Sequence, residues 1–546
     1  MSLQLSKRTQ RNISCAVLAL PLALANLSGV HAATATVVKS TTTAAGTTTS
    51  YAATVITATT TTAGKTSTST PANTTTGTTT TGTSTSILPT IKNTAAAAPV
   101  LAYSNTTAFG NFLRPFAANS MWNARPVNPV FGTFVIPTSS YYPAIGAGAF
   151  STGVFEGLAT DPAVVVSGLP NSKGVWDPDS ETYVPSVTIP HWPAATTPAT
   201  GGDGHADIVD TTTGIVHSFW QLKKVDGKWV AATYAWTRID GSGWGNPTHY
   251  YQGARAAAVP PIGGLIRKHE LNDGAPTYKH ALAMSLTFNG LSPKPAYVFP
   301  ATSADTNAAS LNSGGIPEGA LVMLPPSFDE NTITNLALRK IVATLKVYGA
   351  YVVDQNVGTP FYIYVENGAG FDLHNGGWSQ PVANDLQRIR AALRMVTSTS
   401  SWLDGNGKTM VPNVTNHNLL SMRGPWVRQS GNVTGKFNSL TQQVEFPATT
   451  TASTMINGST RGLAGVTWVR AAAGDTVRLS VTATGGAKMR IQVWTGTKVF
   501  LDTGNLGNGQ SARWTIPAGA WYSFYTVSGN SGTESTVKGV FEKVAP

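Results

Sequence analysis

The stretch that most constrains the fold reads Gly201-Gly-Asp-Gly-His-Ala-Asp-Ile-Val-Asp-Thr-Thr-Thr-Gly-Ile-Val-His-Ser-Phe-Trp-Gln221. It contains two runs rich in β-branched and apolar residues, separated by a turn that carries Gly214. Two such runs around a short glycine-containing turn are typical of a β-hairpin. Side chains two residues apart on a strand share a face, so Asp203, His205 and Asp207 are expected to point the same way.

The register of this hairpin decides which side chains meet. If Val209 pairs with Ile215, Asp207 lies opposite His217 on the neighbouring strand. One face then carries the imidazoles of His205 and His217 and one carboxylate. A slip of one residue would move His217 to the other face of the sheet, so the predicted cluster depends on this register.

Three interpretations fit such a face. We favour the first, in which Asp207 orients an imidazole, His205 or His217, that acts as a general base. No cofactor is predicted outright, although the same three residues would suit a divalent metal as a site of two histidines and one carboxylate. The third interpretation is a hydrogen-bonded turn network without catalysis. Asp203 and Asp207 alone do not make a glycosidase pair, because four residues of strand separate them by about 13 Å, and such pairs lie roughly 5 to 9.5 Å apart.

Aromatic and basic residues follow the hairpin. Trp and Tyr combine a flat apolar face, on which a sugar ring stacks, with a hydrogen-bonding tip, and arginine binds a carboxylate through parallel N–H donors. The predicted substrate-binding residues are Asp203, Gln221, Trp220, Trp236, Trp244, Arg255 and Arg267. The predicted catalytic residues are His205, Asp207, His217, Tyr234 and Tyr250, with the tyrosines as proton donors.

Residues 105–428 are predicted to form the main domain. Short β-branched and aromatic runs, broken by Gly, Pro, Asn and Asp, continue to about Ala320 and indicate strands. Apolar residues at spacings of three and four then predict helices over Thr332–Tyr348 and Val382–Val396, with a buried strand over Ala350–Asp354 between them. The predicted fold class is α+β, with a predominantly antiparallel, β-sandwich or jelly-roll-like main domain and two packed helices.

A polar stretch, residues 429–454, is predicted to link the main domain to a small all-β sandwich over residues 455–546. Strict alternation in Thr476–Thr482 and Met489–Trp494 indicates half-buried strands. Through Ala473-Gly-Asp-Thr-Val477, Ile491-Gln-Val-Trp494 and Pro517-Ala-Gly-Ala-Trp-Tyr522, this part resembles the pre-peptidase C-terminal β-sandwich appended to secreted bacterial enzymes. The resemblance implies a binding or targeting role, and a passive stabilising cap is the alternative.

The N-terminal residues predict export. Residues 1–32 combine basic residues, an apolar run and small residues before Ala33, which is the order of a secretory signal. The apolar run is shorter than the roughly 20 residues that span a bilayer, so no transmembrane segment is expected. Residues 33–104 are mostly Thr, Ser, Ala and Gly and predict a disordered tether. We therefore expect a secreted or cell-surface protein.

Charge narrows the expected partners. The net charge of +11 favours an anionic partner, which outside the cell means a uronate-rich or sulfated polysaccharide, a teichoic polymer or phospholipid headgroups. Nucleic acid is not expected, because the chain has neither a Lys/Arg-rich run nor a recognition-helix pattern. The only cysteine, Cys15, lies in the predicted signal, so a mature disulfide is not expected either.

Several short segments of the main domain resemble a group of uncharacterised secreted bacterial proteins. The segments are Asp203-Gly-His205, Phe219-Trp-Gln221, Gly253-Ala-Arg-Ala256, Gly263-Gly-Leu-Ile-Arg267 and His280-Ala-Leu282. The resemblance spans residues 110–400 approximately and implies a shared fold, but it implies no activity and no catalytic residue.

Three functions are consistent with these features. The leading hypothesis is a secreted carbohydrate-active enzyme that cleaves an acidic polysaccharide as a lyase, with a histidine base and with Arg255 or Arg267 neutralising the uronate carboxyl. The second is a glycoside hydrolase, with acids drawn from Asp203, Asp207, Glu270, Asp354 and Glu366. The third is a non-catalytic cell-surface protein that binds glycan through the tether and the sandwich.

Overall fold

The computed structural model describes residues 36–38, 53–55, 108–414, 418–458, 463 and 465–546. The chain divides into two compact units, Met1–Val100 and Leu101–Pro546. In the first unit, strands β1 (Thr36–Val38) and β2 (Ala53–Val55) pair antiparallel within the segment expected to be a disordered tether. The predicted secretory signal and the rest of the predicted tether lie outside the described residues.

A mixed seven-stranded sheet forms the centre of the main domain. Strands β16 and β18 pair parallel in its middle, and their apolar side chains are buried on both faces, as expected for strands covered on both sides. In spatial order the strands are β4 (Val130–Phe131), β20 (Arg394–Ser398), β17 (Leu321–Met323), β18 (Ala350–Asn356), β16 (Leu282–Thr287), β19 (Phe361–Tyr364) and β5 (Ala144–Gly146).

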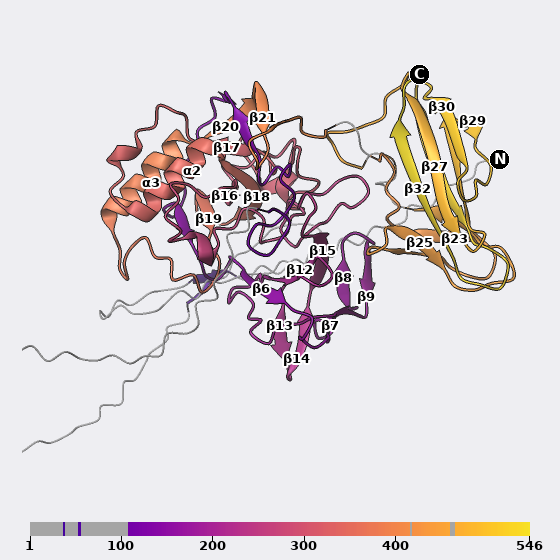
Figure 1. Ribbon diagram of the computed structural model, residues 1–546, viewed down its shortest axis with the longest axis horizontal. Coiled ribbons are helices and arrows are strands. Elements are labelled where there is room, and N and C mark those ends of the chain that lie inside the picture. The colour runs from indigo at the N-terminus through magenta and orange to yellow at the C-terminus, as the bar shows by residue number, and fades with distance from the viewer. Residues whose placement is uncertain (1–35, 39–52, 56–107, 415–417, 459–462, 464) are drawn as a thin grey trace, which may run out of the picture. The chain divides into compact units, whose positions relative to one another are not determined.

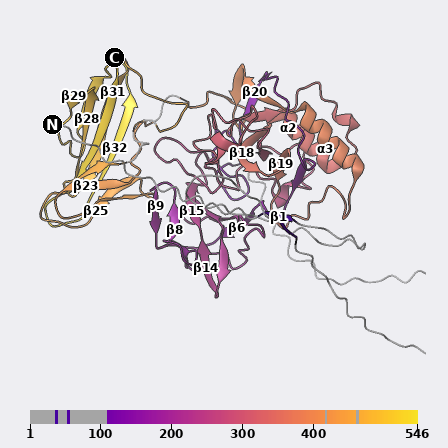
Figure 2. The ribbon, with the colours of Figure 1, turned by 180° about the vertical axis from the view of Figure 1, so that it is seen from behind.

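Two helices pack against this sheet, α2 (Leu336–Val347) and α3 (Gln380–Ala392). They lie side by side in both views (Figure 1, Figure 2). Asn335 caps α2 by accepting the N–H of Leu338, which explains why the helix begins later than expected. Shorter helical turns are η1 (Lys268–Glu270), α1 (Ala308–Leu311) and η2 (Glu330–Thr332). Both predicted helices are confirmed, but the end of the second belongs to β20, where β-branched residues favour a strand.

A six-stranded and a four-stranded sheet enclose a second apolar core. The six-stranded sheet consists of β6 (Gly153–Gly157), β11 (Ala206–Asp210), β12 (Ile215–Trp220), β15 (Thr233–Arg238), β8 (Val175–Asp177) and β9 (Thr182–Val184). The four-stranded sheet consists of β10 (Ser186–Ile189), β7 (Val164–Gly168), β14 (Lys228–Ala231) and β13 (Lys223–Val225). Val166, Ile208 and Phe219 from the two sheets meet in this core. A small sheet of β22 (Thr409–Met410), β21 (Ser401–Leu403) and β3 (Arg125–Val127) completes the main domain.

The predicted hairpin is confirmed as β11 and β12, but its register differs from the expected one by one residue. Asp210 pairs with Ile215, so Asp207 lies opposite Ser218, and His217 lies opposite Ile208. The turn chemistry is the physical reason, because the Asp210 carboxylate accepts the N–H groups of two turn residues at 3.0 Å and closes the turn one position later. His217 therefore points to the face opposite Asp207, and the expected cluster does not form.

The C-terminal domain is an antiparallel β-sandwich of two five-stranded sheets around one core. One sheet has the order β23 (Trp426–Ser430), β26 (Thr454–Asn457), β31 (Ala520–Val527), β28 (Lys488–Thr495) and β29 (Lys498–Asp502). The other has the order β24 (Lys436–Asn438), β25 (Gln443–Phe446), β32 (Ser535–Lys543), β27 (Thr476–Thr484) and β30 (Ser511–Thr515). The α+β fold class with its C-terminal sandwich is thus confirmed.

The predicted linker over residues 429–454 is wrong. Its residues form β24, β25 and the end of β23, and β25 pairs with the long strand β32. Val444 and Phe446 of β25 are buried, while alternate residues are polar. The polar composition therefore reflects the outward faces of short strands rather than a flexible connection.

Candidate functional site

The main candidate site is a cleft of about 380 Å³, within the usual size range of ligand pockets, roughly 300 to 1,000 Å³. Its walls come from segments far apart in the chain: strand β8, the end of β12 and the start of β15 in the six-stranded sheet, the loops near 203–205, 251–256 and 303–306, and the C-terminal half of β18. The aromatic lining residues are Trp176, Trp220 and Tyr251. The lining residues with ionisable side chains are Asp203, His205, Arg255, Asp305 and Asp354.

His205 lines the cleft with an uncharged ring. Its Nδ1 lies 3.2 Å from the carbonyl oxygen of Phe219, and because a carbonyl only accepts, Nδ1 carries the proton and Nε2 keeps its lone pair. Burial, together with the nearby Arg255 charge, lowers the pKa of His205 to about 4. Gly204 allows this placement, since its φ of +45° lies in the left-handed region and a Cβ there would meet the Leu222 carbonyl oxygen at 3.0 Å.

Asp203 is fixed at the cleft by the end of the hairpin. Its Oδ1 accepts the indole N–H of Trp220 at 3.0 Å, and its backbone carbonyl accepts the N–H of Gln221 at 2.7 Å. These bonds hold a carboxylate beside an aromatic wall of the cleft.

Arg255 holds Asp354 at the end of β18. Its Nη1 donates to Asp354 Oδ2 at 3.0 Å, and its guanidinium carbon lies 3.6 Å from the centre of the Tyr364 ring. The Arg255 side chain is only 1% exposed, whereas Asp354 is 19% exposed. The arginine is therefore almost covered where it lines the cleft, and the carboxyl group of Asp354 is the more accessible of the two.

Asp305 is the second carboxyl group on this side of the cleft. Its Oδ2 accepts the backbone N–H of Gln355 at 3.0 Å, which ties it to the residue after Asp354. Glu318, fully buried behind it, accepts the Asp305 backbone N–H at 3.0 Å. Burial raises the pKa of Glu318 well above its ordinary range, and the neighbouring Asp305 adds to this rise.

The carboxyl groups of Asp305 and Asp354 titrate near neutrality. Burial, with the negative charge of Asp203, raises the pKa of Asp305 to about 6. Burial also raises the pKa of Asp354 to about 7, while Arg255 opposes this rise and Asp305 adds to it. Because interacting acids titrate as a pair, the two groups together hold one proton between these values. The cleft thus offers one proton donor and one ionised carboxylate at the same pH.

Four predicted site residues meet in this cleft: Asp203, His205, Trp220 and Arg255. Sequence reasoning missed Asp305, and it named Asp354 only among scattered acids of the hydrolase hypothesis. The position of Asp354 as the last residue of the predicted strand, after four buried residues, was a usable signal, since polar residues near strand ends often line sites. Asp305 lies in a loop with no comparable pattern.

The predicted catalytic cluster of His205, Asp207 and His217 does not form. Asp207 is fully buried, and its Oδ2 accepts the backbone N–H of Ile262 at 2.5 Å. His217, on the other face of the sheet, is hydrogen-bonded through Nδ1 to the Tyr234 hydroxyl at 2.8 Å. The divalent-metal site considered for these three residues is therefore wrong in its geometry.

The other predicted site residues also lie elsewhere. Burial raises the pKa of Tyr234, which sits in the core between the sheets and does not reach the cleft as a proton donor. Tyr250 is 2% exposed and packs into the C-terminal core. The ring of Trp236 contacts His249, Trp244 stacks on Trp122, and Gln221 closes the hairpin through its backbone. Aromatic residues on alternating strands belong to the cores here, so their sequence pattern reflects packing.

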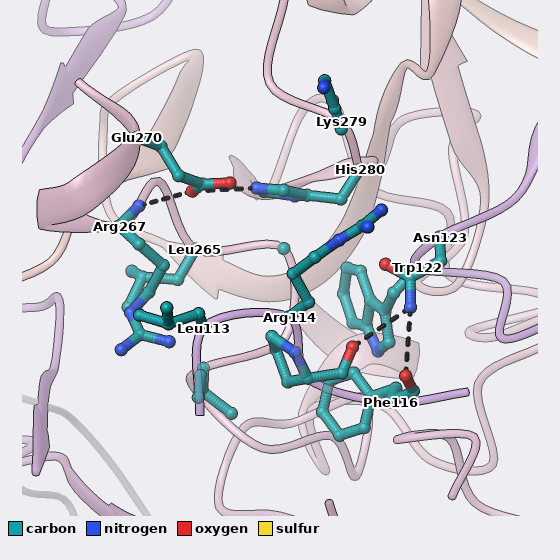
Figure 3. Close-up of a pocket in the computed structure, with 13 residues that line it drawn as sticks. Leu113, Arg114, Phe116, Trp122, Asn123, Leu265, Arg267, Glu270, Lys279 and His280 are labelled. Carbon is teal, nitrogen blue, oxygen red and sulfur yellow. Dashed lines mark hydrogen bonds and ion pairs between the residues drawn. The ribbon is translucent and has the colours of Figure 1, made fainter. Parts of the chain in front are cut away.

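Arg267 lines a different and much smaller cavity of about 40 Å³. Figure 3 shows Glu270 in this cavity, between the ring of His280 and the backbone N–H of Arg267. His280 donates from both ring nitrogens, to the Ala281 carbonyl and to Glu270, and the Glu270 charge raises its pKa. Arg267 itself pairs with Glu366 at 2.8 Å. This network cross-links the main domain rather than presenting groups to a ligand.

The buried Asp207 yields a prediction for stability. Burial raises the pKa of Asp207 to about 7, so the folded protein keeps a proton that the unfolded chain releases near pH 4. This contribution is fully present below pH 4 and is lost as pH rises to 7, by about 1.4 kcal/mol per pH unit at most. Asp207→Asn should not lose stability in this way as the pH rises. The difference between its free energy of unfolding and that of the natural protein should therefore increase, in favour of the variant, from pH 4 to pH 7. Urea unfolding at pH 5 and pH 8 measures it.

The control for this prediction is the exposed hairpin-turn residue Asp226, replaced by asparagine, which accepts the same left-handed backbone. That variant should follow the natural protein at both pH values. Parallel pH dependence of Asp207→Asn and the natural protein would contradict the assignment of a protonated Asp207.

Within the described residues, no group of three or more His, Cys, Asp or Glu side chains is arranged to hold a metal ion. In the same part of the chain, no helix is long and apolar enough to cross a membrane.

Comparisons with known proteins give little. No model of a known protein family matches the chain, and no curated protein matches it. Among solved structures, the enzymatically active domain of tailspike protein 4 of bacteriophage CBA120 is 13% identical, with a TM-score of 0.16, over 22% of this chain and 19% of that one. A glycosylation-associated protein complex from Streptococcus agalactiae is 12% identical, with a TM-score of 0.16, over 22% and 44%.

A third similar structure is an endo-1,4-beta-D-xylanase 10B fragment of Clostridium thermocellum, which is 12% identical with a TM-score of 0.16 over 24% of this chain and 28% of that one. The chain thus spans less than half the length of each of these three structures. Similarities of this size assign no function, so the proposals below rest on the geometry of the chain itself.

Proposed function

We propose that the protein is a polysaccharide hydrolase whose active site is the cleft between Asp203, His205, Asp305 and Asp354. The observation that supports it is the pair of Asp305 and Asp354, which holds one proton near neutral pH inside an aromatic-lined cleft. Glycoside hydrolysis requires this combination, a carboxylic acid that protonates the leaving oxygen and a carboxylate that activates water or attacks the sugar.

The surroundings assign the two roles. The pKa of Asp354, about 7, is the higher of the two, because burial and the charge of Asp305 outweigh the hydrogen bond from Arg255, so Asp354 is the acid. The pKa of Asp305 is lower, about 6, and the hydrogen bond from the Gln355 N–H favours its ionised form, so Asp305 is the base or nucleophile. In the reaction Asp354 gives its proton to the glycosidic oxygen, the C–O bond breaks, and water supplies the hydroxyl group on the sugar carbon and a proton.

His205 and the aromatic residues bind the substrate. The neutral imidazole keeps an acceptor at Nε2, which suits a sugar hydroxyl donor. Trp176, Trp220 and Tyr251 offer flat faces for sugar rings. Asp203, held by Trp220, adds an acceptor for a second hydroxyl group.

The cleft favours a neutral sugar chain over the acidic one expected from the net charge. Its lining contains three aspartates but only one arginine, so a polyanion would meet negative charge. The β-elimination hypothesis requires a cation free to neutralise a uronate carboxyl. Arg255 is engaged by Asp354, and Arg267 is paired with Glu366 away from this cleft. Secretion is predicted from the N-terminal sequence, and an exported hydrolase would meet polysaccharides outside the cell.

A substrate panel tests the function. The purified chain is incubated with neutral polysaccharides, including xylan, mixed-linkage glucan and mannan, and with uronate polymers. We expect new reducing ends from a neutral polymer without ultraviolet absorbance of an unsaturated product. Absorbance growth on a uronate polymer would select elimination instead, and folded protein that is silent on every polymer would select the non-catalytic binding hypothesis.

The pH dependence of kcat/KM is a second test. Activity requires one proton on the Asp305 and Asp354 pair, whose pKa values are about 6 and about 7. Below this window both groups are protonated and the base is lost, and above it both are ionised and the acid is lost. We therefore expect a bell-shaped profile with its maximum between about pH 6 and 7. A rate that rises steadily into alkaline solution, as proton abstraction by a base would give, contradicts these roles.

A further inference from the structure

The outer face of one sheet in the C-terminal sandwich carries a set of aromatic and polar side chains. Met489, Ile491 and Val493 of β28 are buried in the core, so the alternate residues of this strand face outward. Strands β28 and β31 pair in register, with Trp494 opposite Trp521. Directly opposed residues share a face, so both indoles lie on this outer face.

The two tryptophans stack on each other and form one apolar block. Their ring centres are 5.0 Å apart, and their planes differ by 9°. Trp521 is 47% exposed, and its Nε1 donates to the Gly496 carbonyl at 2.9 Å, which fixes the ring. On the neighbouring strand β29, Val499 lies opposite Trp494 and is 44% exposed. A contiguous apolar surface with a fixed orientation is thus open to solvent on this domain, and contiguous exposed apolar patches are often binding sites.

A row of polar groups runs along the same face beside the indoles. Arg490 lies opposite Tyr525, two residues along the strand from Gln492. Asp502 accepts from Arg490 Nε at 2.8 Å and from Gln492 Nε2 at 3.0 Å, and the Tyr525 hydroxyl donates to Gln492 Oε1 at 3.1 Å. The row is rigid, and the charges of Arg490 and Asp502 cancel. It offers directed hydrogen-bonding groups without net charge.

We propose that this face is a binding site for a neutral β-1,4-linked polysaccharide, separate from the cleft. The sugars of such a chain carry their hydroxyl groups around the ring edge and expose apolar faces, so they stack on an indole while their edges bond to a polar row. The charge balance argues for this occupant, because a polyanion or an anionic membrane surface needs unpaired cations, and the arginine beside the indoles is paired with Asp502. The other outward cation of β28, Lys488, lies at the opposite end of the strand from Trp494. None of these residues lines the cleft.

The test is retention of the full chain on insoluble polysaccharide. Microcrystalline cellulose and insoluble xylan are the probes, and depletion of protein from solution gives the affinity. Trp521→Ala should weaken binding by at least about tenfold, which corresponds to about 1.4 kcal/mol. Tyr525→Phe, which removes one hydroxyl group of the polar row, should weaken it less. Retention of Trp521→Ala at full strength, or no retention of the natural chain on either probe, overturns the proposal.

The matched control is Trp378→Ala. Trp378 is 63% exposed on the main domain, before α3, so its removal tests whether any exposed indole supports retention. It should bind as the natural chain does, and an equal loss in both tryptophan variants overturns the site. Thermal unfolding checks that each variant is folded. Because retention does not require cleavage, Asp305→Asn should be retained normally, which separates this proposal from the proposed hydrolase activity.

Discussion

Asp354→Asn is expected to lower kcat/KM on a natural polysaccharide by about 10²- to 10⁴-fold, the usual contribution of a positioned general acid. Asparagine has the same shape and keeps an oxygen that accepts from Arg255, but it has no proton to give to the glycosidic oxygen. The loss should nearly vanish on an aryl glycoside with a good leaving group, because such a group departs without protonation. The measurement is kcat/KM of the variant and of the natural protein on both substrates. A loss that is much larger on the polysaccharide than on the aryl glycoside identifies the acid.

The comparison variants make the assignment specific. Asp305→Asn should be slow on both substrates, since a good leaving group does not replace the base or nucleophile. Asp240→Asn, at an exposed aspartate paired with the exposed Arg238, should behave like the natural protein. The alkaline limb of the pH profile should disappear in Asp354→Asn. An equal loss on both substrates, or no loss on either, would show that Asp354 is not the proton donor.

The hairpin shows what the sequence pattern determines and what it leaves open. Alternation and the glycine turn correctly predicted two paired strands, and Asp203 and His205 of the Asp-Gly-His segment both line the cleft. The register was not predictable from alternation, because it depends on the Asp210 carboxylate that caps the turn. A shift of one residue moved His217 to the other face and removed the cluster on which the lyase hypothesis relied.

The rest of the site depends on contacts between segments distant in sequence. Asp305 reaches the cleft from a loop, and it meets Asp354 only because β18 lies in the middle of the sheet and ends there. Spacing along the chain contains no information on such a meeting. The pairing of Arg255 with Asp354 is a similar case, since the sequence gives the arginine but not its partner. The sequence therefore predicted the cleft residues that belong to the hairpin, Asp203, His205 and Trp220, but not the meeting of Asp305 with Asp354.

The join between the two domains of the Leu101–Pro546 unit is also a packed contact and not a linker. Arg423, which is fully buried, donates from Nε to the Asp179 carbonyl at 2.7 Å and from Nη2 to the Pro178 carbonyl. Its charge faces Asp179 at 3.5 Å. Gln442, from the predicted linker, donates to the same Asp179 carboxylate at 2.8 Å. Pro178 lines the cleft, so the sandwich supports the wall of the proposed active site.

Arg423→Ala should therefore cost about 3 to 5 kcal/mol of unfolding free energy, the usual cost of removing one partner of a buried ion pair. The substitution leaves the Asp179 carboxylate, 3% exposed, without its cation, and it removes the guanidinium that lies 4.4 Å from the Tyr250 ring centre. Loss of the bond to Pro178 should also raise KM, because the cleft wall loses its support. Urea unfolding measures the first effect, and steady-state kinetics below the unfolding transition measures the second.

Arg478→Ala is the matched control for this prediction. Arg478 pairs with Glu542 within the sandwich, but the two side chains are 48% and 38% exposed, and such surface pairs contribute about 0 to 1 kcal/mol. The two variants remove the same side chain and differ in burial and in the contact between domains. If Arg423→Ala unfolds at the same urea concentration as Arg478→Ala, the buried arginine does not join the domains. If it unfolds earlier with an unchanged KM, the sandwich is attached firmly but does not shape the cleft.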